Sequence, residues 1–112
     1  MKSTIIKLSD RDVELKVNAY SFILYENEFK GRNFLKDFNN VLGVDGEEPL
    51  VSNHLRFTWA LAKTANPGLE DFEQFANSVS LDDVLGVVST IVKLINESLG
   101  IGDSKNRTAV DQ

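Results

Sequence analysis

The broadest run of hydrophobic positions in the chain lies in residues 50–65. On a helical wheel its apolar side chains cover roughly 200°, whereas a surface helix needs little more than about 100°. The pattern predicts a central helix that packs on two sides, the second side being covered by the same chain or by a partner. We expect this helix to stop at Asn66, because Pro67 disfavours helical geometry in the residue before it.

Residues 3–17 alternate between apolar and polar side chains in two short runs. A period of two is typical of strands with one buried face, and the Ser-Asp-Arg-Asp sequence at residues 9–12 favours a turn between them. The segment therefore predicts a β-hairpin. Because a two-stranded ribbon is only marginally stable alone, we expect it to pack on the helices or to join another sheet, including that of a second copy.

Four more helices are predicted from apolar residues at helical spacing and from residues that typically begin or end helices. Their ranges are 19–29, 33–42, 67–79 and 81–99. We expect Asn66 to cap the third of these and Pro67 to begin it. The last is rich in β-branched side chains, so a strand is its rival, but its length and period favour a helix. Residues 100–112 have lost the periodicity, which predicts a flexible tail.

Together these elements predict an α+β fold that is mainly α, with an N-terminal β-hairpin, about five helices and a tail. The 112 residues suffice for one globular domain, which we place at residues 1–99. The net charge is −5 and the 12 basic residues are scattered, which argues against nucleic-acid binding. The chain has no cysteine, and no apolar run approaches the roughly 20 residues of a membrane span. We therefore expect no disulfide, no membrane partner and an intracellular protein.

The sequence offers no candidate for a catalytic residue. His54 is the only histidine and lies on the apolar face of the central helix, where an imidazole is more often a packed core residue. The acidic residues 45–48 lack the ligand spacing of a calcium-binding loop. Asp82 and Asp83 open a predicted helix, where carboxylates serve capping and the helix dipole. We expect no catalytic residue, cofactor or metal, and an enzyme is the least favoured alternative.

Aromatic side chains concentrate in the middle of the chain. We expect most of them to form the core, but aromatic residues also dominate protein interfaces. Trp59 closes one edge of the 200° apolar arc (a helical-wheel angle, roughly). Tyr20 and Leu24 lie off the apolar stripe of their own helix. These three residues are the first candidates for contact with another protein.

Two segments resemble tail assembly chaperones of long-tailed bacteriophages and prophages. Residues 25–37, YENEFKGRNFLKD, are similar to a Tyr-x-x-x-Phe-Gly-x-Asp-like segment of that family, and residues 55–63, LRFTWALAK, are similar to its Trp-Ala-(Leu/Met)-Ala-Lys helix. In the family a short break and a Phe-containing helix follow, and an N-terminal hairpin precedes. The sequence departs from the family pattern at Lys30, which separates Phe29 from the glycine, and at Asn33, where aspartate is common.

The resemblance implies a non-catalytic viral chaperone that binds the tape measure protein and assists polymerisation of the tail-tube protein. Such a protein acts in the host cytoplasm, is generally absent from the mature virion and can form homo-oligomers; many members also exist in a longer, frameshifted form. It implies that the apolar arc of residues 50–65 accepts an amphipathic client helix. The candidate protein-binding residues are Tyr20, Leu24, Tyr25, Phe29, Phe34, Leu55 and Trp59. The alternative function is that of a homodimeric small adaptor with an unrelated role.

Overall fold

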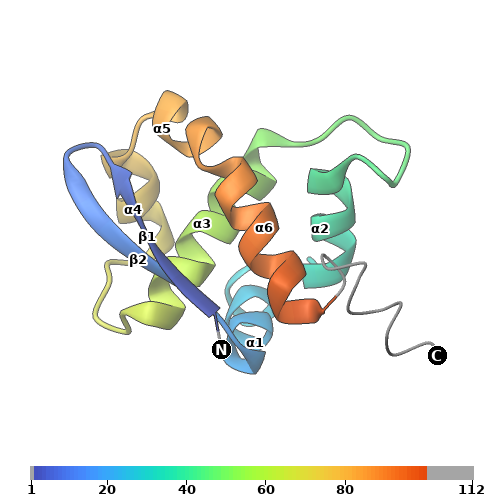
Figure 1. Cartoon of the computed structure of the whole chain (residues 1–112), viewed down its shortest axis with the longest axis horizontal. Helices are drawn as coiled ribbons and strands as arrows, with labels where there is room; N and C mark the ends of the chain where they lie inside the picture. Colours follow the sequence, from blue (N-terminus) through green and yellow to red (C-terminus); the bar gives the residue numbers. More distant parts are fainter. Residues whose placement is uncertain (1, 101–112) are drawn as a thin grey trace.

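A β-hairpin and six helices form the described part of the chain, which is residues 2–100 of a computed structural model (Figure 1). The fold is α+β and mainly α, as the sequence predicts. The elements are β1 (Lys2–Leu8), β2 (Arg11–Val17), α1 (Ala19–Glu28), α2 (Phe34–Leu42), α3 (Val51–Ala65), α4 (Phe72–Ser78), α5 (Leu81–Gly86) and α6 (Val88–Leu99). The predicted tail, apart from Gly100, lies outside the described residues.

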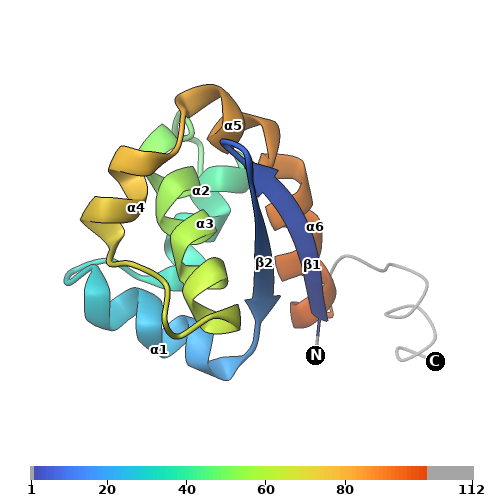
Figure 2. The same ribbon diagram turned by 90° about the vertical axis from the view of Figure 1, so that its left-hand side faces the viewer.

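The hairpin is closed by a two-residue turn. Leu8 pairs with Arg11 across the ladder, and Ser9 and Asp10 have φ values of 46° and 75°. Positive φ at both central residues defines a type I′ turn, whose twist matches that of the flanking strands. The alternation of side chains predicted from the sequence is confirmed: Ile6, Leu8, Val13, Leu15 and Val17 are buried on one face. That face packs on α3 and α6 (Figure 2).

Helix α3 passes through the middle of the molecule. It contacts β2 and all the other helices, α1, α2, α4, α5 and α6. All six residues from 57 to 62 are buried. Consecutive residues of a helix point in different directions, so a buried run of this length means that α3 is covered around its whole circumference there. The predicted packing on two sides is therefore present, and the chain itself supplies both sides.

The helix predicted at residues 67–79 begins later, as α4. Asp71 caps it, because its side chain accepts a hydrogen bond from the backbone N–H of Gln74 at 2.8 Å. The prediction that Asn66 caps this helix is wrong. The Asn66 side chain instead accepts from the N–H of Gly68 at 3.1 Å, which fixes a local turn. Because the segment between α3 and α4 is not helical, it can fold back along α3.

The helix predicted at residues 81–99 is divided into α5 and α6, which makes six helices within residues 2–100 rather than about five. The break falls at Val87, with φ −106° and ψ 4°, directly after Gly86, a residue of low helix propensity. Ser80 caps α5, because its side chain accepts a hydrogen bond from the backbone N–H of Asp83 at 3.1 Å. The Asp83 carboxylate accepts from the backbone N–H of Ser9 at 2.7 Å. This contact ties α5 to the hairpin turn, while α6 packs on α3 and on both strands.

Candidate functional site

The aromatic residues of the segment at 25–37 form the centre of the core. Tyr25 and Phe57 stack with ring centroids 4.7 Å apart, and Phe34 lies edge-on to both at 5.4 and 5.0 Å. All three side chains are fully buried. They join α1, α2 and α3, so their role in this structure is to hold these helices together.

Trp59 belongs to a second aromatic group with Phe29 and Phe72. Its ring lies 5.7 Å from Phe29 and 5.9 Å from Phe72, measured between centroids. The indole Nε1 donates a hydrogen bond to the backbone carbonyl of Glu70 at 3.0 Å. Trp59 is only 2% exposed, so the prediction that it lies at the surface is wrong. The physical reason is that the segment between α3 and α4 folds over the indole and accepts its hydrogen bond.

The predicted protein-binding residues do not form one surface. Only Tyr20 among the seven is exposed, at 54%. Leu24, Phe29 and Leu55 are partly buried against the core. Tyr25, Phe34 and Trp59 are buried. The expected client groove on the apolar arc of α3 is therefore wrong, because the hairpin and the other helices already cover that arc.

A buried polar network links α1 to α2 beside the aromatic core. Asp37 accepts hydrogen bonds from the Tyr25 hydroxyl at 2.7 Å and from Arg32 Nε and Nη2 at 2.7 and 2.9 Å. Burial by itself raises the pKa of Asp37, but the hydrogen bonds from Arg32 and Tyr25 outweigh it and hold the pKa below its ordinary value. Burial and then the hydrogen bond to Asp37 raise the pKa of Tyr25. Asp37 is thus a charged anchor for two elements.

A second polar group fixes the loop between α2 and α3. The Asn40 Oδ1 atom accepts from the backbone N–H of Leu50 and from Asn53 Nδ2, both at 2.9 Å. The Asn40 amide donates to the carbonyl of Glu48 at 3.2 Å. Asn53 is fully buried and also accepts from Arg56 Nη2 at 2.5 Å. Asn53 can be buried because its hydrogen-bond partner Asn40 comes from α2.

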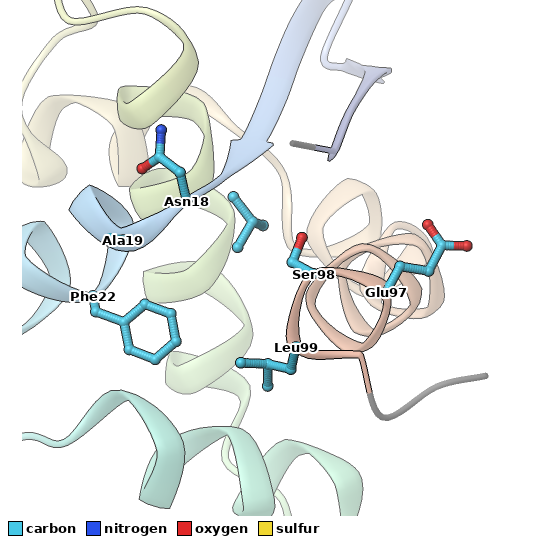
Figure 3. A pocket seen from close by; sticks show the side chains of 7 residues that line it. Asn18, Ala19, Phe22, Glu97, Ser98 and Leu99 are labelled. Atoms are coloured by element: carbon cyan, nitrogen blue, oxygen red, sulfur yellow. The ribbon is translucent and has the colours of Figure 1, made fainter. Parts of the chain in front are cut away.

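A groove runs between α6 and the pair formed by α1 and α2. It consists of two adjoining hollows of about 430 and 520 Å³, both bordered by Glu97. Figure 3 shows the first hollow, where Phe22 of α1 and Leu99 of α6 point toward one another. We call this surface the α6 groove. Its apolar residues are Val17, Phe22, Val41, Leu42, Val92 and Leu99, and its polar residues include Asn18, Ser89, Lys93, Asn96 and Glu97.

The α6 groove exists because α2 and α6 both pack on α3 without closing on each other. Val41 and Leu42 at the end of α2 and Val92 on α6 are only partly buried at this gap. Helix α6 has 12 residues, so it offers about 18 Å of surface along the groove. Sequence reasoning missed the groove, since one wall comes from α1 and α2 and the other from α6, which lies far from them in the chain. The apolar spacing of Val92 and Leu99 was its only sequence signal.

His54 lies on α3 and is partly buried. Burial lowers its pKa, and neither ring nitrogen has a hydrogen-bond partner within residues 2–100. The same residues contain no group of three or more His, Cys, Asp or Glu side chains that could hold a metal ion. None of the helices described is both long and apolar enough to cross a membrane.

Comparisons with known proteins leave the family open. No family model, no curated protein and no solved structure matches the chain. The functional inference therefore depends on the two segments that resemble tail assembly chaperones and on the surface of the molecule itself.

Proposed function

We propose that the protein is a non-catalytic tail assembly chaperone of a long-tailed phage or prophage. In this role it binds the tape measure protein and assists polymerisation of the tail-tube protein. The support from the sequence is the resemblance of residues 25–37 and 55–63 to that family. In this chain both segments contribute mainly to the core, which is compatible with a resemblance in fold. The binding surface has to be sought elsewhere.

We place the client in the α6 groove, and the composition of this groove is the observation that carries the proposal. Phe22, Leu42 and Val92 give it an apolar floor, while Lys93 and Glu97 give its rim both signs of charge. An amphipathic helix presents apolar anchors at i, i+3, i+4 and i+7 and polar side chains at its flanks. Such a helix suits a groove that extends over about three turns of α6.

Weak binding at each groove is sufficient for the proposed role. A tape measure protein is a long helical client, and many chaperone copies could occupy successive turns of its apolar stripe. Binding of several copies to one client raises the overall avidity well above that of a single contact. Coverage of the stripe would prevent clients from aggregating with each other until tube subunits replace the chaperone.

The proposal is tested by co-expression with tagged fragments that tile a tape measure protein encoded next to this chain. The variants are Val92→Glu in the groove and Leu85→Glu on α5 as its matched control, since Leu85 is an exposed leucine outside the groove. We expect at least one fragment to be recovered as a soluble complex with the wild type and with Leu85→Glu. Val92→Glu should weaken capture by about tenfold or more, because a charge replaces an apolar contact.

Two outcomes would overturn the proposal. Failure of every fragment to form a soluble complex with the wild type would reject the client. Equal capture by Val92→Glu and the wild type would reject the α6 groove as its site. Thermal melting of both variants ensures that a loss of capture is not a loss of folding.

A further inference from the structure

The outer face of α6 carries two charged side chains that form no ion pair with the other described residues. Lys93 and Glu97 are both exposed, and neither forms an ion pair within residues 2–100. They are four residues apart, so they lie on the same side of the helix, one turn from each other. They also border the α6 groove, and a further hollow of about 340 Å³ lies on the other flank of α6, next to β1.

This charge pattern is complementary to itself in one orientation. If two copies of α6 lie antiparallel about a two-fold axis between residues 93 and 97, Lys93 of each copy faces Glu97 of the other. In a parallel arrangement in register, like charges would face each other. A patch that meets an identical patch about a two-fold axis is the usual basis of a symmetric homodimer. Although the whole chain has a net charge of −5, these two residues sum to zero, so this face does not add to the repulsion between copies.

We propose that a second copy of this chain docks its α6 helix in the α6 groove, antiparallel to the first. In this dimer, α6 of each copy inserts into the gap between α2 and α6 of the other copy. The two copies therefore make identical contacts. Contact of Val92 with Val41 and Leu42 of the other copy provides the apolar burial. The two reciprocal pairs of Lys93 with Glu97 fix the antiparallel orientation, since charge complementarity contributes more to specificity than to affinity.

The dimer does not depend on the proposed chaperone function. If that function also holds, dimer and client occupy the same groove and exclude each other, so the dimer would be the resting form. A client helix would then compete with the second copy, and the equilibrium would shift with the concentration of each.

Charge reversal tests the dimer without touching the core. The single variants Lys93→Glu and Glu97→Lys each place like charges opposite one another in the antiparallel pair. We expect the wild type to dimerise in a concentration-dependent way in sedimentation velocity, and each single variant to weaken the dimer by about tenfold. The double variant Lys93→Glu/Glu97→Lys restores complementary charges and should restore the dimer.

Mixing the two single variants gives the sharpest result. One then carries Glu at both positions and the other Lys at both, so a mixed dimer has two complementary pairs. We expect the mixture to dimerise although each variant alone is largely monomeric. A change in the intrahelical contact between residues 93 and 97 would not be repaired by mixing, so this outcome distinguishes contact between copies from a local effect.

Three results would overturn the dimer. These are a wild type that stays monomeric up to about 1 mM, single variants that dimerise as well as the wild type, or a mixture that stays monomeric. Client capture remains measurable in each case with Val92→Glu and Leu85→Glu. Failure of the dimer is therefore distinguishable from failure of the chaperone proposal.

Discussion

Helices α3 and α6 differ in how fully the chain covers them. Helix α3 has the widest apolar face, and the hairpin and five helices cover it, with residues 57–62 all buried. Helix α6 buries Ile91, Leu94 and Ile95 toward the interior, but Val92 remains only partly buried at the groove. A wide apolar arc therefore marks the centre of this fold. The surface that we propose for a partner lies on α6, a helix with a narrower apolar face.

The strongest test of this comparison is to truncate one apolar side chain on each helix, a buried one on α3 and a partly buried one on α6. Trp59→Ala should lower the free energy of unfolding by about 3–5 kcal/mol, because it leaves a cavity and removes the hydrogen bond to Glu70. Val92→Ala should cost about 1 kcal/mol or less, since Val92 is only partly buried. Urea denaturation measures both values. Similar losses for the two variants would contradict the assignment of α3 to the core and α6 to the surface.

A second prediction concerns the charged anchor beside α3. Asp37→Asn should lower the free energy of unfolding by about 2–4 kcal/mol, because Arg32 and the Tyr25 hydroxyl lose their charged acceptor. The stability of the wild type should depend on this group in acid. The pKa of Asp37 is lower in the folded state, so its contribution is present above about pH 3.9, the pKa of an unfolded aspartate.

This contribution disappears as the pH falls through the lowered pKa of the folded state. Denaturation of the wild type and of Asp37→Asn from pH 6 to pH 2 (about the range in which the carboxyl titrates) should give curves that converge in acid. A constant gap between the two curves would show that the Asp37 charge does not stabilise the fold.

A smaller effect is expected where the loop joins α3. Asn40→Ala should lower the free energy of unfolding by about 1–3 kcal/mol, because the buried amide of Asn53 and the N–H of Leu50 lose their acceptor. Hydrogen exchange at the Leu50 amide should become faster while exchange at the α6 amides stays the same. Faster exchange along α6 would show that α6 unfolds together with the loop between α2 and α3. This would contradict the view that α3 and α6 differ in how fully the chain covers them.

The elements that the sequence predicts well are those with local signals. Asn18 and Asn33 each cap a helix through their own side chains, and Gly43 ends α2 in the left-handed conformation. The hairpin follows from alternation and a polar turn, which also depend on neighbouring residues only. Sequence reasoning failed where distant segments decide the outcome. Helix α5 is held at Ser9, which lies 74 positions earlier than Asp83. The cap of α4 is a local failure, because Asp71 caps this helix in place of the nearby Asn66.

The candidate site was harder to predict than the fold for the same reason. Tyr20 was correctly expected at the surface, but burial of Trp59 depends on the carbonyl of Glu70 in a segment expected to be helical. The sequence does not reveal the hydrogen bond between Asn40 and Asn53, because it forms only when α2 and α3 pack together. The α6 groove has no sequence motif, because it results from the separation of α2 and α6 on α3.

The fluorescence of Trp59 tests the central claim most directly, because it is the only tryptophan of the chain. The claim is that the apolar arc of α3 is filled by the chain itself. Acrylamide quenching of the native protein should be several-fold weaker than that of the protein in urea, and it should not change when a client fragment binds. Strong quenching in the native state, or protection that begins only with the client, would place Trp59 at a partner surface and contradict the account.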